Sequence, residues 1–129
     1  MTIALYPSMS DASHVRVWLG ITGQAAAPTP TWAFAPVSGA AQASAPAVVR
    51  PLAPVRGAIP PSSGTARTFS GLFEFPVPAA NGVDRPAYRV TVTIGKESAS
   101  LVTRPLPNDF EPGPTGAFTL LLASCYCRD

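Results

Sequence analysis

Residues 88–94 read YRVTVTI, and this short stretch decides the fold class. Its bulky apolar side chains occupy every second position, and polar residues stand between them. This period of two is typical of a β-strand that buries one face against a core. The residues that follow, GKES at 95–98, are typical of a hairpin connection, so we expect SLVTR at 100–104 to pair back as the next strand.

Further stretches on the N-terminal side are also expected to be strands. HVRVWLGI at 14–21 repeats the alternation, with Val, Val, Leu and Ile on one face. The apolar stretch at 47–59 is interrupted by Pro51 and Pro54, and proline confines such a segment to sheet edges, so we predict two short edge pieces there. The remaining expected strands are TIALY at 2–6, TWAFAPV at 31–37 with Trp32 and Phe34 on one face, and TFSGLFEFPV at 68–77 with Phe69, Phe73, Phe75 and Val77 on one face.

The composition excludes several classes of protein. The chain has 129 residues, the size of one domain, and its 16 prolines leave few stretches in which a helix could form. No apolar run approaches the roughly 20 residues that span a bilayer, and the first residues lack the regions of a secretory signal. A net charge of +2 argues against a nucleic-acid-binding protein. The residues therefore predict a small all-β domain, a sandwich or a barrel, with Pro-rich loops.

The C-terminal part of the chain departs from this pattern. Residues 105–116 (PLPNDFEPGPTG) have the composition of a linker, through which no strand can run. Residues 117–127 (AFTLLLASCYC) are almost continuously apolar, which is typical of a strand buried on both faces in an α/β sheet. We therefore predict a β-sandwich at 1–104, a linker at 105–116 and, at 117–129, the first strand of a truncated second domain.

This order of sandwich, Pro-rich joint and buried strand resembles the N-terminal region of the PhoD-like alkaline phosphatase and phosphodiesterase family. RVWLG at 16–20 is similar to the Trp-bearing first strand of that family's sandwich, and YRVTVTIG followed by RPLP is similar to its last two strands. The resemblance implies an immunoglobulin- or fibronectin-III-like antiparallel β-sandwich, followed by the first strand of a metallophosphatase domain as a C-terminal extra strand. The most specific match, F-x-L-x-x-A-S-C, consists of Phe118, Leu120, Ala123, Ser124 and Cys125.

The resemblance also implies a role for Cys125, as a ligand in the di-metal site of a full-length relative. There a transition metal such as iron would be accompanied by a divalent ion. Such a centre needs several Asp, His and Asn ligands, whereas this chain has one histidine, at position 14, and only Asp129 after the cysteines. We therefore expect neither a cofactor nor enzymatic activity in this chain. The structural alternative for Cys125 is a buried small apolar side chain, and we expect no role for Cys127.

The one histidine is a further candidate for chemistry. His14 could act as a base beside Ser13 or Asp11, because a nucleophile site needs a nucleophile, a base and an orienting group in contact. A single histidine at the start of a strand is more often a solvated surface residue, and we favour that interpretation.

The aromatic residues and the arginines also have two interpretations each. Trp18, Trp32 and Tyr88 could form an aromatic sugar-binding platform, but they are more often found filling a sandwich core or covering its rim. Dispersed arginines could form a phosphate-facing patch, but they usually make a solvated face. The arginines in question are Arg16, Arg50, Arg56, Arg67 and Arg89.

We expect the chain to be a non-catalytic accessory domain, which packs on a metallophosphatase catalytic domain in the same or a separate chain and shapes access to its phosphoester-hydrolysing site. The alternative is a stand-alone binding module for a glycan or a protein partner, which uses exposed aromatic side chains or a free sheet edge. Neither nucleic acid nor a membrane is an expected partner. The family is usually exported, but no export signal is visible, so the cytoplasm is the default compartment.

The C-terminal stretch generates a testable prediction, because an apolar strand without its sheet is a template for self-association. If residues 117–127 lack their sheet in this chain, truncation at Pro112 is expected to increase the monomeric fraction, measured by light scattering against the full-length chain. Unchanged or poorer behaviour of the truncated chain would show that the strand belongs to this domain.

Overall fold

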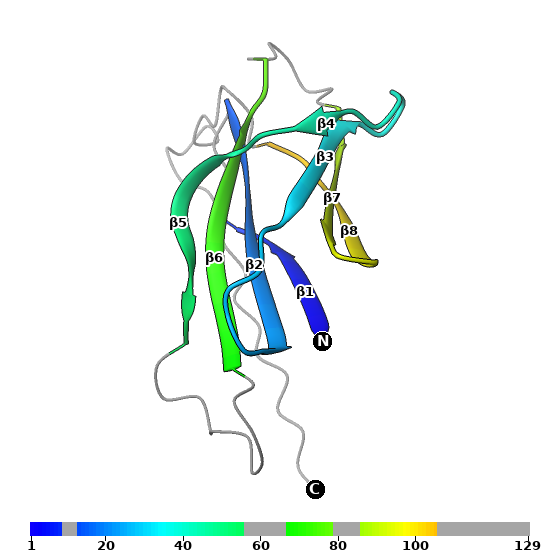
Figure 1. The fold of residues 1–129 in the computed structure, drawn as a ribbon. Helices are drawn as coiled ribbons and strands as arrows, with labels where there is room; N and C mark the ends of the chain where they lie inside the picture. Colours follow the sequence, from blue (N-terminus) through cyan, green and yellow to red (C-terminus); the bar gives the residue numbers. More distant parts are fainter. Residues whose placement is uncertain (9–12, 56–66, 79–85, 106–129) are drawn as a thin grey trace, which may run out of the picture.

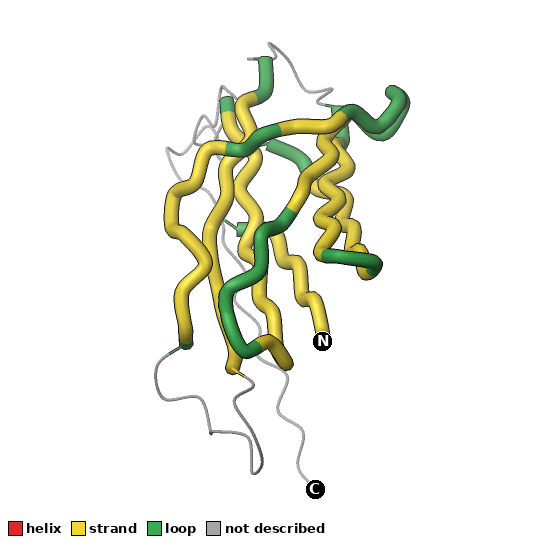
Figure 2. Tube along the Cα trace, in the orientation of Figure 1, coloured by secondary structure: helices red, strands yellow, loops and turns green. Residues whose placement is uncertain are grey.

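The computed structural model describes residues 1–8, 13–55, 67–78 and 86–105, and within these ranges the secondary structure consists of strands (Figures 1 and 2). Alternating apolar residues form the long strands, as the sequence pattern predicts. The strands are β1 (Thr2–Pro7), β2 (His14–Gln24), β3 (Thr31–Pro36), β4 (Ala43–Ser44), β5 (Ala47–Pro54), β6 (Arg67–Pro76), β7 (Tyr88–Ile94) and β8 (Glu97–Thr103).

The strands form two antiparallel sheets that pack face to face. Sheet A has the order β1-β2-β6-β5, and sheet B has the order β4-β3-β7-β8. In the seven-strand immunoglobulin arrangement, the first, second, fifth and fourth strands make one sheet and the third, sixth and seventh make the other. If β4 is left out of the count, the strands here follow the same arrangement. The short β4 is an addition at the edge of sheet B. The predicted all-β, immunoglobulin-like sandwich is confirmed for the described residues.

The chain passes from one sheet to the other at one side of the sandwich. Only Ala45 and Pro46 separate β4, at the edge of sheet B, from β5, at the edge of sheet A. Figure 1 shows this crossing as an almost continuous path along the upper side of the molecule. On the opposite side, β1 of sheet A lies close to β8 of sheet B.

The core lies between the sheets and is formed by the side chains that alternate along β2, β6 and β7, together with Trp32 of β3. Phe34 stacks on Phe75 with ring centroids 4.6 Å apart and on Tyr88 with centroids 4.9 Å apart, so aromatic rings join the two sheets. The faces predicted for the three long strands are confirmed. Their buried residues are Val15, Val17, Leu19, Ile21, Phe69, Phe73, Phe75, Val77, Tyr88, Val90, Val92 and Ile94.

Several boundaries differ from the predictions. The hairpin connection is only Gly95-Lys96, and β8 begins at Glu97 rather than at Ser100, because the positive φ of Gly95 (61°) reverses the chain within two residues. Gly23, with φ of 80°, lies in a bulge that lets β2 continue to Gln24. The short strand β4 lies in a stretch expected to be loop.

The 47–59 segment is one edge strand rather than two pieces over its described part. β5 runs from Ala47 to Pro54, and its pairing with β6 is interrupted by two register shifts, one between Val48 and Arg50 and one between Arg50 and Ala53, where Pro51 lies. The remainder of that segment, the predicted linker beyond Pro105 and the predicted strand at 117–129 with Cys125 and Cys127 lie outside the described residues.

Gly71 of β6 allows the irregular part of β5 to approach closely. A Cβ atom at this position would lie 3.0 Å from the Arg50 carbonyl oxygen and 3.1 Å from the Leu52 nitrogen. Both are backbone atoms of a paired strand, so they cannot rotate away as a side chain could. A glycine within a strand is typical of such a close backbone approach.

We therefore predict that Gly71→Ala destabilises the domain by about 1–3 kcal/mol through overpacking. The measurement is urea unfolding followed by circular dichroism. The matched control is Gly39→Ala, whose added Cβ would make only an ordinary 3.4 Å contact, and we expect its effect to stay within about 0.5 kcal/mol. Equal stability of the two variants would contradict the close approach of β5.

Candidate functional site

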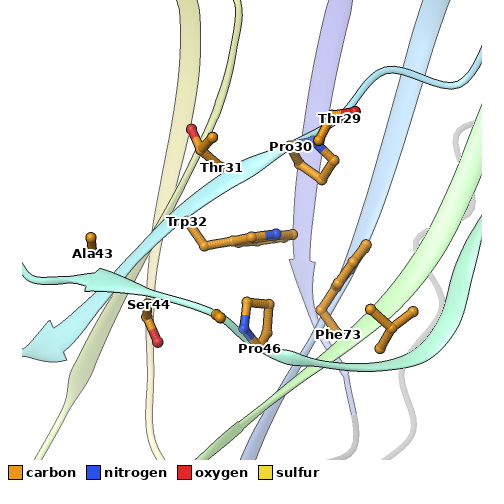
Figure 3. A pocket seen from close by; sticks show the side chains of 10 residues that line it. Thr29, Pro30, Thr31, Trp32, Ala43, Ser44, Pro46 and Phe73 are labelled. Atoms are coloured by element: carbon orange, nitrogen blue, oxygen red, sulfur yellow. The ribbon is translucent and has the colours of Figure 1, made fainter.

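An apolar recess opens at the side where the chain crosses between the sheets, and we call it the Trp32 recess. Its volume is about 520 Å³. Figure 3 shows the indole of Trp32 and the ring of Phe73 facing it, with Pro30 and Pro46 beside them. The recess is lined by Thr29, Pro30, Thr31, Trp32, Ala43, Ser44, Ala45, Pro46, Val48 and Phe73.

The recess exists because the residues along this edge of the sandwich are too small to fill it. Trp32 packs on Phe73 with a centroid distance of 4.7 Å and on Phe75 with one of 5.5 Å, so its indole closes the end of the core. The strand paired with β3 at this edge is β4. It presents Ala43 and Ser44, which are too small to cover the rings from outside. The described residues of the lining are apolar or carry only a hydroxyl group, so this part of the recess suits an apolar group.

A second candidate surface lies on the outer face of sheet A, and we call it the outer aromatic row. The strand register places Tyr6, Trp18, Leu72 and Arg50 on one line across all four strands. The ring centroids of Tyr6 and Trp18 are 5.8 Å apart. An open recess of about 620 Å³ extends along the part of this row from Trp18 to Arg50, and it is lined by Ser8, Trp18, Arg50, Pro51, Ala53, Pro54, Ser70, Gly71 and Leu72.

The indole of Trp18 leans along the surface of the sheet, over its neighbour on the same face. A Cβ atom at Gly20 would lie 2.6 Å from Cη2 and 2.7 Å from Cζ3 of the Trp18 ring. The absence of a side chain at Gly20 therefore allows the ring to lean over this position. The ring contacts Gly20 on one side and remains 37% exposed, which leaves an aromatic surface for a ligand.

Polar side chains gather at one end of the β2–β6 pair. The Ser13 hydroxyl lies 3.0 Å from Nδ1 of His14, and Nε2 of His14 lies 3.5 Å from Oε1 of Glu74. Arg16 donates from Nε to Oε2 of Glu74 at 2.5 Å. The Ser13 hydroxyl, the His14 imidazole and the Glu74 carboxylate therefore lie in contact in this order. Neither the Trp32 recess nor the outer recess is lined by Ser13 or His14, and the carboxylate also binds Arg16, so this cluster is best described as an ion-paired network that links two strands.

The favoured interpretation, that these aromatic side chains fill the core or cover its rim, is confirmed for Trp32 and Tyr88, so the alternative of a platform made of all three does not hold. Trp32 and Tyr88 are buried between the sheets, whereas Trp18 lies on the outer face of sheet A, because alternate positions of a strand point to opposite faces. The partner of Trp18 is Tyr6 of β1, which no local sequence pattern marks as a binding residue. The signal was present in the alternation of TIALYP, but the pairing register is needed to place the two rings together.

The arginines do not form one patch. Arg16 is paired with Glu74, Arg50 lies in the outer aromatic row, and Arg89 belongs to sheet B. Arg56, Asp11 and Asp129 lie outside the described residues, as do both cysteines. Among the residues that are described, no group of three or more His, Cys, Asp or Glu side chains could hold a metal ion.

Comparison with protein-family models, with curated proteins and with solved structures finds no match to this chain. In the described part of the chain, no helix is long and apolar enough to span a membrane.

The two tryptophans generate a prediction, because one fills the core and the other lies on the surface. We expect Trp32→Ala to lower the free energy of unfolding by about 3–5 kcal/mol, since it leaves a cavity beside Phe73 and Phe75. Trp18→Ala removes a partly exposed ring and is expected to cost about 1 kcal/mol. Urea unfolding of both variants provides the measurement. Equal losses would contradict this assignment of the two side chains.

Proposed function

We propose that this chain is a non-catalytic accessory module, which packs against a partner domain through the Trp32 recess. The observation that carries the proposal is the position of the recess, at the open end of an aromatic core and between the edge strands of both sheets. An apolar side chain inserted there would contact Trp32 and Phe73 and would extend the core. Burial of apolar surface contributes about 25 cal/mol per Å².

A protein partner fits this recess better than a small polar metabolite. The described part of the walls offers rings, prolines and small side chains, and none of these residues carries a charge that could orient a polar ligand. Val48, at the rim, is 58% exposed, and Val49 next to it is 46% exposed, so apolar surface continues from the recess along β5. Such a surface resembles the central part of a protein–protein contact, which is depleted of charged residues.

The partner that we propose is a PhoD-like metallophosphatase domain. The support is the resemblance in the sequence, whose segments RVWLG and YRVTVTIG correspond to β2 and to β7 with its hairpin glycine. In this proposal Cys125 is a ligand in the metal site of the partner domain, where iron or a similar transition metal and a divalent ion would be bound. The sandwich shapes access to that site and provides no catalytic group.

The coding sequence that follows the codon for Asp129 is the first test. Segments rich in Asp, His and Asn that form a metallophosphatase domain would support the tethered form of the proposal. Their absence would remove that form and leave only a separately encoded partner.

A matched pair of substitutions tests the recess itself. Val48 and Val102 are both exposed valines on edge strands, at 58% and 53%, but only Val48 lines the recess. We expect Val48→Asp to weaken the complex with the metallophosphatase domain at least tenfold, because it buries a charge in an apolar contact, and Val102→Asp to leave it unchanged. Calorimetric titration measures both. Equal affinities would overturn the Trp32 recess as the contact.

A further inference from the structure

We propose that the outer aromatic row binds an acidic oligosaccharide, a linear sugar chain with carboxylate groups. This surface lies on the outer face of sheet A and shares no residue with the Trp32 recess, so the inference goes beyond the proposed accessory function. It rests on three features: an aromatic shelf, a narrow strip across the sheet and an arginine at one end of that strip.

The shelf is formed by Trp18 and Tyr6. The Trp18 ring leans over Gly20 and exposes the remainder of its surface, and the Tyr6 ring, 58% exposed, lies beside it at an interplanar angle of 42°. The negative face of an aromatic ring attracts the C–H groups on the flat face of a sugar. The two rings, tilted toward each other, therefore offer contacts to successive rings of one chain.

The strip is long and narrow. Four side chains from four adjacent strands span three interstrand spacings of about 4.8 Å each, a length comparable to that of a short oligosaccharide. On one side the strip is bounded by the ion pair of Arg16 with Glu74, and on the other by Gly20 and Ser70. A stable protein contact needs about 800 Å² on each partner, whereas a strip one residue wide fits a linear chain.

The end of the strip on β5 carries a positive charge. The Arg50 guanidinium forms no hydrogen bond or ion pair with another described residue, and it lines the outer recess together with Pro51 and Pro54. Glu74, the acidic residue on the neighbouring row of the same face, is already bound to Arg16. A guanidinium can donate two parallel hydrogen bonds to a carboxylate, so the charge favours a sugar acid over a neutral sugar.

The experiment uses the full chain, with trigalacturonate as the acidic probe and maltotriose as the neutral one, by isothermal titration calorimetry at millimolar probe. We expect trigalacturonate to bind at least tenfold more tightly than maltotriose. Arg50→Gln is expected to weaken trigalacturonate binding about tenfold or more, and Trp18→Ala to abolish it. The charge control is Arg89→Gln, which replaces an exposed arginine on sheet B and is expected to leave the affinity for trigalacturonate unchanged. Circular dichroism verifies that each variant is folded.

Gly20→Ala provides a second test that keeps every side chain of the row. Its methyl group would occupy the space of the Trp18 ring and lift the indole from its position, so we expect weaker binding of trigalacturonate in a folded protein. Val48→Ala, which trims the wall of the Trp32 recess without adding a charge near Arg50, is expected to leave this binding unchanged. A loss on that substitution would place the sugar in the wrong recess and overturn the proposal.

Three other outcomes overturn it as well. If neither probe gives a heat of binding in the titration, the outer aromatic row is not a sugar site. If the two probes bind with equal affinity, the carboxylate groups have no role in binding. If no sugar binds and Trp18→Ala instead weakens the complex with the metallophosphatase domain, the row is a protein contact. That last result would leave the accessory function intact, so the two proposals can fail independently.

Discussion

Three stacked rings, those of Phe75, Phe34 and Tyr88, form the contact on which the rest of this sandwich depends. They come from one strand of sheet A and two strands of sheet B, and their planes are inclined by only 17° and 5°. Many immunoglobulin domains hold their sheets together with a disulfide between the second and sixth strands. Here both cysteines lie at the C-terminal end of the chain, so aromatic packing holds the sheets together in the described body.

The two sheets present different outer surfaces. Sheet B has an outer face of small and polar side chains, such as Thr91, which is hydrogen-bonded to Ser100 at 2.7 Å. Sheet A has the outer aromatic row. The aromatic core also ends at Trp32, where β4 supplies only Ala and Ser, and this leaves the Trp32 recess. The two candidate binding surfaces are therefore an unfilled end of the core and an aromatic strip on one outer face.

The sequence predicts the long strands well, because one buried face imposes a period of two on β2, β6 and β7. It could not predict β4, since Ala43 and Ser44 have no strand-forming pattern and pair only because β3 lies beside them. The partnership of Tyr6 with Trp18 and that of His14 with Glu74 depend on register between strands, which local patterns do not encode. Of the candidate site, the residue types were visible in the sequence, but their arrangement was not.

The pairing of β2 with β6 has a consequence for how the chain folds. Trp18 pairs with Leu72, and the chain between them contains β3, β4 and β5. Contacts between residues so far apart in sequence require loop closure before they stabilise anything, and sandwiches dominated by them fold in milliseconds to seconds. The β7–β8 hairpin, closed by two residues, is a local unit that can form much earlier. From this topology we expect the hairpin to form early and the two halves of sheet A to come together slowly.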